Sequence, residues 1–515
     1  MLRLTWVQPE DLIGHELRQA AQDGRDASAI ESRWLAAGGH LAPDRAGASP
    51  EPSPLRGLAE ELLTELASLP SPLASTEPTA LPAIESLTNQ GPPPRPFPKV
   101  LPDGPPQSPE GLTSQPLRQT RNGATSEPRS GTRGSGGLGA EPPGAQPRRG
   151  PGAEPPVSGR GGVGEENALH AAWLGRAVGC LLGKPVEKLP LDGIRAIARS
   201  TANWPLHTWF TERDLDPAIA AAHPWNRRSA PTSLAENIDG MPEDDDLNYP
   251  LLALLLVQRH GPTFTTTDVA KLWLDELPAG RTFTAERIAY RNLLTGLEPP
   301  HTATHHNPFR EWIGAQIRAD VFGWISPGDP VRAARLAHRD AVLTHTANGV
   351  YGAMFTAATI AAAASGTADV HTALHTGLTV VPPHSRYAQA VRHGIGLATK
   401  HAGSDFETVV DELHATYAAT HHWVHVLPNA ALLAAALTHA DGDFEGSICR
   451  AVSGGWDTDS NGATAGSIAG LLAGRPDALG AHWTAPLKNH LSTTVAGFDG
   501  IGFDELARLT LELRT

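Results

Sequence analysis

The chain has 515 residues, a formal net charge of −14 and two cysteines. The acidic balance argues against a protein that coats nucleic acid, because that role needs a basic surface, and two cysteines are too few for a disulfide framework. No uninterrupted apolar run reaches the roughly 20 residues of a membrane helix, and the acidic start of the chain does not resemble a secretory signal. We therefore expect a cytoplasmic protein with no membrane partner and no general nucleic-acid binding.

The first region, residues 1–70, contains two helical patterns. One follows Pro9 and the other follows Pro54, and both carry leucines at helical spacing. So short a region cannot form a large core of its own. We expect a small helical unit that docks on the main domain or on a partner, and we prefer this reading to a catalytic role.

The second region, residues 71–165, holds much of the excess of the 46 prolines and 52 glycines. It shows almost no apolar periodicity. Such a composition buries too little surface to offset the entropy lost on ordering. We therefore predict a disordered linker.

The third region, residues 166–515, consists of long segments rich in alanine and leucine. Their apolar residues recur at helical spacing, and no repeated strand-turn-strand pattern appears. We predict one all-α domain in which strands are at most minor. Helices are expected over 166–183, 250–260, 331–338, 348–365, 387–400, 405–418, 428–440, 444–452 and 461–473.

An acidic loop joined to a glycine-rich helix lies near the end of the chain. Residues 457–460, Asp-Thr-Asp-Ser, follow two glycines and offer the oxygen ligands that Mg²⁺ prefers. From Gly462 to Gly474 glycine recurs every fourth residue, which forms one row along a helix and lets another helix approach closely. The acidic and hydroxyl residues are also favoured helix caps, so this loop alone fits a metal site and a cap equally.

A second acidic run, residues 243–246, reads Glu-Asp-Asp-Asp and precedes an apolar helix. Adjacent carboxylates repel one another unless a cation or solvent compensates. Because the run joins a core helix directly, solvent is less available there. The run therefore favours a metal site over a cap in the first loop as well.

A third stretch repeats glycine every fourth residue from Gly175 to Gly183, and Pro185 ends that helix. We expect the helix to pack on the glycine row of 461–473, which would carry Glu187 towards the acidic loop. Taken alone, Glu187 fits an exposed glutamate better.

A fourth stretch places His345 and Asn348 one helical turn apart, with Gly349 leaving room for a ligand. His345 fits a hydrogen-bonded core histidine equally well. Further upstream, Arg318 and Asp320 are expected to form a buried structural pair.

Taken in their order along the chain, the four stretches resemble the ADP-ribosylglycohydrolase family, which includes the dinitrogenase reductase-activating glycohydrolases and the eukaryotic ADP-ribosylhydrolases. The resemblance covers roughly residues 166–515. It implies an orthogonal helical bundle and a cleft that holds two Mg²⁺ ions, or Mn²⁺ in some members.

The resemblance also implies roles for residues of this chain. Glu187 matches the catalytic glutamate, whereas Glu243 and Asp246 stand where the family commonly has hydroxyls. The expected catalytic residues are Glu187 and Asp459; the expected metal ligands are Glu243, Asp244, Asp245, Asp457, Asp459 and Ser460; the expected substrate-binding residues are His345, Asn348, Gly349 and Tyr351.

The implied activity is hydrolysis of the glycosidic bond between ADP-ribose and an acceptor, which is a protein side chain or a small molecule. Two alternatives stay open. The same site would also suit another N-glycoside or nucleoside-like substrate, since family membership does not define the leaving group. A non-catalytic ADP-ribose-binding or structural homologue is the second, although the presence of Glu187 and all four matching aspartates counts against it.

Overall fold

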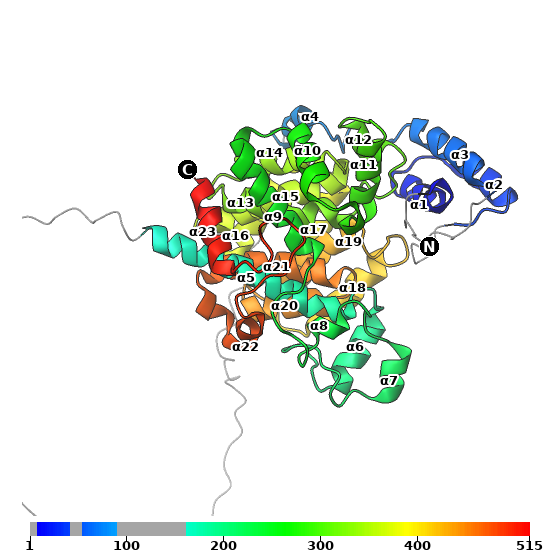
Figure 1. Cartoon of the computed structure of the whole chain (residues 1–515). Coiled ribbons are helices and arrows are strands. Elements are labelled where there is room, and N and C mark those ends of the chain that lie inside the picture. Colours follow the sequence, from blue (N-terminus) through cyan, green and yellow to red (C-terminus); the bar gives the residue numbers. More distant parts are fainter. Residues whose placement is uncertain (1–7, 42–53, 90–160, 515) are drawn as a thin grey trace, which may run out of the picture. The chain divides into compact units, whose positions relative to one another are not determined.

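The computed structural model describes residues 8–41, 54–89 and 161–514. Regular structure in these ranges is helical, as the all-α prediction required (Figure 1). Strand-type pairing among them is limited to three isolated β-bridges, Met241 with Leu491, Trp312 with His425, and Leu491 with Ile501. The described residues belong to one compact unit, which comprises Met1–Pro98 and Gly161–Thr515.

Two long helices pack along their glycine rows in the centre of this unit, α5 (Gly161–Gly183) and α21 (Thr458–Ala473). A Cβ atom on Gly175 would lie 2.2 Å from the carbonyl oxygen of Gly466, so the two backbones are in direct contact. This is the packing that the two glycine patterns predicted. It places the end of α5 beside the start of α21.

The other long helices surround this pair. Helices α15 (Ala347–Ala363) and α19 (Val426–His439) are buried along almost their whole length, because alanines and other mostly apolar residues occupy all of their faces. The long helices are α9 (Asp245–His260), α10 (Thr266–Glu276), α11 (Thr284–Leu294), α14 (Pro330–Ala341), α15 (Ala347–Ala363), α16 (Val370–Leu378), α17 (Arg386–Lys400), α18 (Phe406–Tyr417), α19 (Val426–His439), α20 (Phe444–Ser453) and α23 (Phe503–Leu511).

Shorter helices join these elements. They are α6 (Leu191–Ser200), α7 (Pro217–Ala222), α8 (Ala230–Ser233), α12 (His301–Thr304), α13 (Asp320–Trp324) and α22 (Ala481–Thr484), with the 3₁₀ turns η1 (Lys184–Val186), η2 (Gly261–Thr263), η3 (Ala279–Arg281), η4 (Ile313–Arg318), η5 (Pro476–Leu479), η6 (Ala485–Leu487) and η7 (Glu512–Arg514). None of the described helices is both long enough and apolar enough to cross a membrane.

Each helix predicted from the sequence is present, but several begin earlier than expected, among them α5 at Gly161, α21 at Thr458 and two helices that contain a proline near their start. Helix α9 begins at Asp245 rather than at Pro250, and α19 begins at Val426, two residues before Pro428. The sequence reading treated these prolines as the first residues of their helices. Pro428 is the third residue of α19, where the N–H groups have no partner within the helix in any case. Pro250 is the sixth residue of α9 and removes one backbone bond, the one to the carbonyl of Asp246.

The N-terminal region corrects the predicted linker boundary. Four helices precede residue 90: α1 (Pro9–Gln22), α2 (Ser28–Ala36), α3 (Arg56–Ser68) and α4 (Leu81–Thr88). Helix α4 lies inside the segment predicted to be disordered, yet its Ile84 is fully buried. Contacts with the main domain order this segment, and its composition could not reveal them. Helix α5 likewise begins inside the predicted linker, at Gly161. Residues 90–160 of that linker lie outside the described residues.

Candidate functional site

A cavity of about 500 Å³ opens where the turn after α5 meets the loops before α9 and α21. Both acidic runs and the glutamate after α5 line it, although they lie far apart in the chain. The predicted residues in its lining are Glu187, Glu243, Asp244, Asp245, Asp457, Asp459 and Ser460.

Asp244 caps α9 and is paired with a lysine. Its Oδ1 accepts a hydrogen bond from the backbone N–H of Asp246 at 2.9 Å, and its Oδ2 contacts Nζ of Lys184. Burial opposes ionisation of this carboxyl, but the lysine outweighs it and the pKa of Asp244 falls below its usual value. The first acidic loop is therefore anchored to the turn that follows α5.

Asp246 is buried and held by Arg176 of α5. Pro250 has no N–H, so the carbonyl of Asp246 lacks the usual donor four residues on. Nε of Arg176 donates to that carbonyl at 2.7 Å, and Nη2 lies 3.3 Å from Oδ1 of Asp246. Because Pro250 cannot donate, the carbonyl of Asp246 accepts from Arg176 instead, and this bond fastens the acidic loop to α5.

A tight turn presents the second acidic loop to the same cavity. Gly455 and Trp456 both have positive φ angles, +80° and +58°, which a tryptophan rarely adopts. The ring of Trp456 stacks on His414 at 4.1 Å between centroids, and His414 bonds to the carbonyl of Gly454 at 2.8 Å. These contacts hold the turn and direct Asp457 towards the cavity.

Two hydroxyl groups join the second loop to its neighbours. Oγ1 of Thr458 donates to the carbonyl of Gly183 at 2.8 Å, and Oγ of Ser460 donates to Oδ2 of Asp246 at 3.3 Å. The hydroxyl groups of the Asp-Thr-Asp-Ser sequence therefore connect the second acidic loop to the end of α5 and to the start of α9.

The cavity aspartates carry charge that this chain does not fully neutralise. Burial and the neighbouring Asp244 raise the pKa of Asp245 well above its usual value. Burial and Asp459 do the same for Asp457, and burial with Glu187 raises the pKa of Asp459 to about 7. A divalent cation with oxygen ligands would relieve this repulsion. The carboxylate of Asp245 accepts no hydrogen bond from any described residue, so it is free to bind such an ion.

Glu243 departs from its predicted role as a metal ligand, because both of its oxygens are already engaged. Oε1 accepts hydrogen bonds from Asn248 at 3.1 Å and Thr494 at 3.0 Å, while Oε2 lies 2.9 Å from Nη1 of Arg281. Glu243 therefore braces the cavity wall. The available ligands that fit a hard cation best are Asp245, Asp457 and Asp459.

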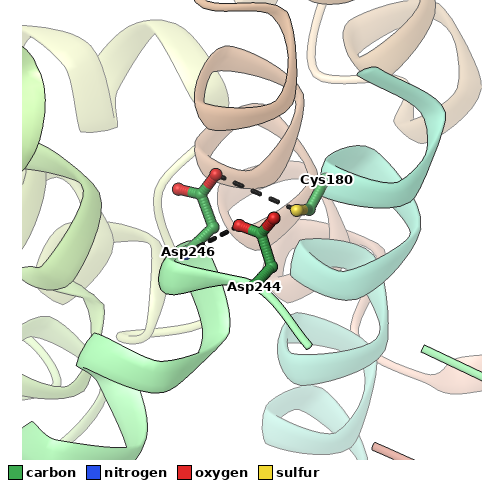
Figure 2. A group of neighbouring side chains, drawn as sticks. All are labelled: Cys180, Asp244 and Asp246. Carbon is green, nitrogen blue, oxygen red and sulfur yellow. Dashed lines mark hydrogen bonds between the residues drawn. The ribbon is translucent and has the colours of Figure 1, made fainter. Parts of the chain in front are cut away.

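Cys180, Asp244 and Asp246 form a compact group beside the cavity (Figure 2). Their possible ligand atoms lie within 4.8 Å of one another. The thiol of Cys180 donates to Oδ2 of Asp246 at 3.9 Å, and burial raises its pKa well above the usual value. A protonated thiol is a poor ligand, and Lys184 and Arg176 already pair with the two aspartates, so this group fits a metal ion less well than Asp245, Asp457 and Asp459 do.

Glu187 follows η1 and is oriented by two neighbours. Nδ2 of Asn226 donates to its Oε2 at 2.8 Å, and Nζ of Lys188 lies 2.6 Å from its Oε1. The backbone N–H of Asn226 also bonds to the carbonyl of Pro185 at 3.0 Å. The sequence analysis missed Asn226, because no local pattern links it to Glu187.

The predicted substrate-binding residues lie elsewhere, which corrects that part of the sequence interpretation. None of His345, Asn348, Gly349 and Tyr351 lines the cavity. His345 is fully buried behind the wall, with its Nδ1 2.6 Å from Oγ1 of Thr344.

The other three face the N-terminal region or pack against the backbone. Nδ2 of Asn348 donates to Glu77 at 2.8 Å, and the hydroxyl of Tyr351 donates to the carbonyl of Pro78. A Cβ atom on Gly349 would lie 2.5 Å from the carbonyl oxygen of Arg310. The side chains of Asn348 and Tyr351, which the sequence assigned to substrate binding, therefore bind residues 77–78 of the N-terminal region instead.

Arg318 and Asp320 are both buried, as expected, but they do not pair with each other. Arg318 contacts Glu286 and Asp340, whereas Asp320 lies 3.0 Å from Nη1 of Arg176. The two side chains therefore contact different helices, Arg318 reaching α11 and α14 and Asp320 reaching α5.

Several lining residues were not found from the sequence. Phe283, Glu286 and Trp423 come from loops or helix starts with no distinctive pattern. The main chain holds part of this wall together, since Ile313 N–H donates to the carbonyl of Val424 at 3.0 Å. Only the tertiary fold assembles these segments.

A family model described as ADP-ribosylglycohydrolase matches residues 164–514, and the chain therefore belongs to that family. No curated protein matches the chain. Matching solved structures include an "ADP-ribosylglycohydrolase-related protein complex", which is 19% identical with a TM-score of 0.41 over 68% of this chain and 98% of the other.

Proposed function

We propose that this member of the ADP-ribosylglycohydrolase family hydrolyses the glycosidic bond between ADP-ribose and an N- or O-linked acceptor, with Mg²⁺ as the preferred ion and Mn²⁺ as a substitute. Family membership supports a glycohydrolase. The observation that carries the finer proposal is the convergence of Glu187, Asp245, Asp457 and Asp459 on one cavity.

The carboxylates suit this reaction electrostatically. Departure of the acceptor leaves positive charge on the ribose ring, and buried carboxylates close to that ring stabilise such charge. Asp245, Asp457 and Asp459 would hold the metal ions. When bound, the ions would neutralise these carboxylates, orient the ribose hydroxyls and acidify a bound water.

Glu187 would act as the general base. Its carboxylate would take a proton from the attacking water while the new bond forms at the anomeric carbon. The bond to the acceptor breaks, and the acceptor departs with the bonding electrons and receives the proton that Glu187 has taken. The contact with Asn226 holds Oε2, and the contact with Lys188 holds Oε1. The charges of Glu187 and Asp459 interact, and both residues line the cavity, which supports a shared role at the reacting centre.

The test is release of free ADP-ribose from arginine-linked, serine-linked and nucleotide-linked substrates, with Mg²⁺ and then with chelator. We expect release that depends on the ion and is lost in Glu187→Gln. Release that survives chelation would contradict the metal requirement. Absence of release from every substrate, by protein shown to bind Mg²⁺, would contradict the proposed reaction.

A further inference from the structure

Four cationic side chains line the cavity, and three of them have carboxylate partners. Lys184 contacts Asp244, Lys188 contacts Glu187 and Arg281 contacts Glu243. The fourth, Arg228, is exposed at the cavity and forms no ion pair with any residue in the described ranges. Its guanidinium is therefore available to a ligand.

Arg228 is held in a defined position relative to Glu187. Oδ1 of Asn226 accepts a hydrogen bond from the backbone N–H of Arg228 at 3.1 Å, while Nδ2 of the same side chain donates to Glu187 at 2.8 Å. One asparagine thus links the proposed general base to the arginine. Glu187 and Arg228 both line the cavity, so a substrate at Glu187 shares that cavity with the arginine.

A second guanidinium lies near Arg228. The pKa of Arg287 is lowered, first by its burial and further by the charge of Arg228, and the Arg287 guanidinium lies 5.9 Å from the ring centroid of Phe283, which lines the cavity. Arg287 does not itself line the cavity, but its positive charge adds to that of Arg228 and favours an anion on that side. The hydroxyl-bearing Ser229 and Thr232 line the same part of the cavity.

We propose that Arg228 is a substrate-specificity residue that binds the diphosphate of an ADP-ribosyl substrate. An arginine fork matches phosphate oxygens in geometry and charge. The carboxylates that line the rest of the cavity would repel a diphosphate, so the Arg228 side is the favourable place for it. This assignment rests on the proposed function. It takes the place of the substrate-binding role that the sequence suggested for the residues around the start of α15.

The test compares the full chain with Arg228→Ala, Arg228→Lys and the matched control Arg227→Ala, whose exposed side chain does not line the cavity. Calorimetry measures binding of ADP-ribose and of adenosine, which lacks the diphosphate. Loss of a charge-assisted contact should raise the Kd of Arg228→Ala for ADP-ribose roughly 10- to 100-fold. Adenosine binding should not change, Arg228→Lys should be intermediate, and Arg227→Ala should match the wild type.

Equal ADP-ribose affinity in Arg228→Ala and Arg227→Ala would overturn the assignment, as would an equal loss of adenosine binding. A loss confined to substrates whose acceptor carries a phosphate would place Arg228 on the acceptor side and overturn it too. Selective loss of ADP-ribose binding in a protein that hydrolyses no glycoside would uphold the subsite and reject the proposed reaction. Hydrolysis with an unchanged KM in Arg228→Ala would uphold the proposed reaction and reject the diphosphate subsite.

Discussion

A Cβ atom built on Gly179 would lie 1.9 Å from the carbonyl oxygen of Gly462, and one built on Gly462 would lie 2.2 Å from the carbonyl oxygen of Gly179. The two helices that carry the proposed base and the second acidic loop therefore touch backbone to backbone. No side chain can be added at this contact without moving a helix.

Gly179→Ala should therefore destabilise the fold by about 3 kcal/mol, near the upper end for overpacked cores. Gly396 is the control, because a Cβ atom there meets nothing within 4 Å and the residue lies in α17. Gly396→Ala should stabilise the protein by roughly 0.5–1 kcal/mol. Chemical denaturation measures both, and similar midpoints for the two variants would refute the close-packing account.

Asn226→Ala should reduce kcat by roughly 10- to 100-fold, because Glu187 loses the contact that orients its Oε2. Asn237→Ala is the matched control from the same segment; that side chain donates to the carbonyl of Ala230 and does not line the cavity. Steady-state kinetics on any active substrate measures the effect. Unchanged kcat in Asn226→Ala would show that Glu187 needs no such support.

Stability of the metal-free protein should fall as the pH rises through the range from about 4 to about 7. The pKa of Asp459 is about 7 in the folded protein against an ordinary value of 3.8, so the folded state binds more protons over this range. The stability contributed by this extra proton binding is fully present below pH 3.8 and is lost above about pH 7. Thermal denaturation should show a shallower pH dependence for Asp459→Asn.

The same experiment includes a control and a metal series. Asp477→Asn changes an aspartate whose side chain is 74% exposed, and its pH dependence should match the wild type. Added Mg²⁺ should raise Tm more at pH 8 than at pH 5, because protons and cations compete for the same carboxylates. An equal rise at both values would argue against binding at these aspartates.

Arg386→Ala should destabilise the protein by about 3 kcal/mol, because it leaves two acids in a nearly buried cluster without their partner. Nη2 of Arg386 lies 2.7 Å from Glu77 and 3.0 Å from Glu311. Arg335 also pairs with the N-terminal region, through Glu85, but both side chains are substantially exposed. Arg335→Ala should cost less than about 1 kcal/mol. Equal losses in denaturation experiments would mean that the buried cluster contributes no special stability.

A chain that starts at residue 161 should lose most of its turnover, contrary to the purely structural role that the sequence favoured for residues 1–70. Glu311 contacts Gln19 and Arg386, and it leads into the main-chain pairing that places Ile313 in the cavity wall. Removing the N-terminal partners would loosen that wall. Supplying residues 1–89 as a separate chain should restore activity, and full activity without them would contradict this view.

The sequence by itself determined the helical class, the contact between the two glycine rows and the acidic runs around the cavity. These are local signals: glycine spacing defines a helix face, and a carboxylate run beside a core helix is conspicuous wherever the helix ends. The family resemblance rested on the same local motifs. Proline was a weaker signal for where a helix begins, since Pro250 lies inside α9. Its missing N–H leaves the carbonyl of Asp246 to accept a hydrogen bond from Arg176.

Tertiary structure alone decided which oxygens remain available and which residues face the cavity. Glu243 and Asp245 are equally acidic in the sequence, yet the first is bonded on both oxygens and the second accepts no bond from the described residues. In the sequence Asn348 resembles a ligand-binding residue, but in the structure its side-chain amide donates a hydrogen bond to Glu77. Hydrogen bonds between distant segments leave no periodic trace in a chain, because any separation along the sequence can bring two groups together in space.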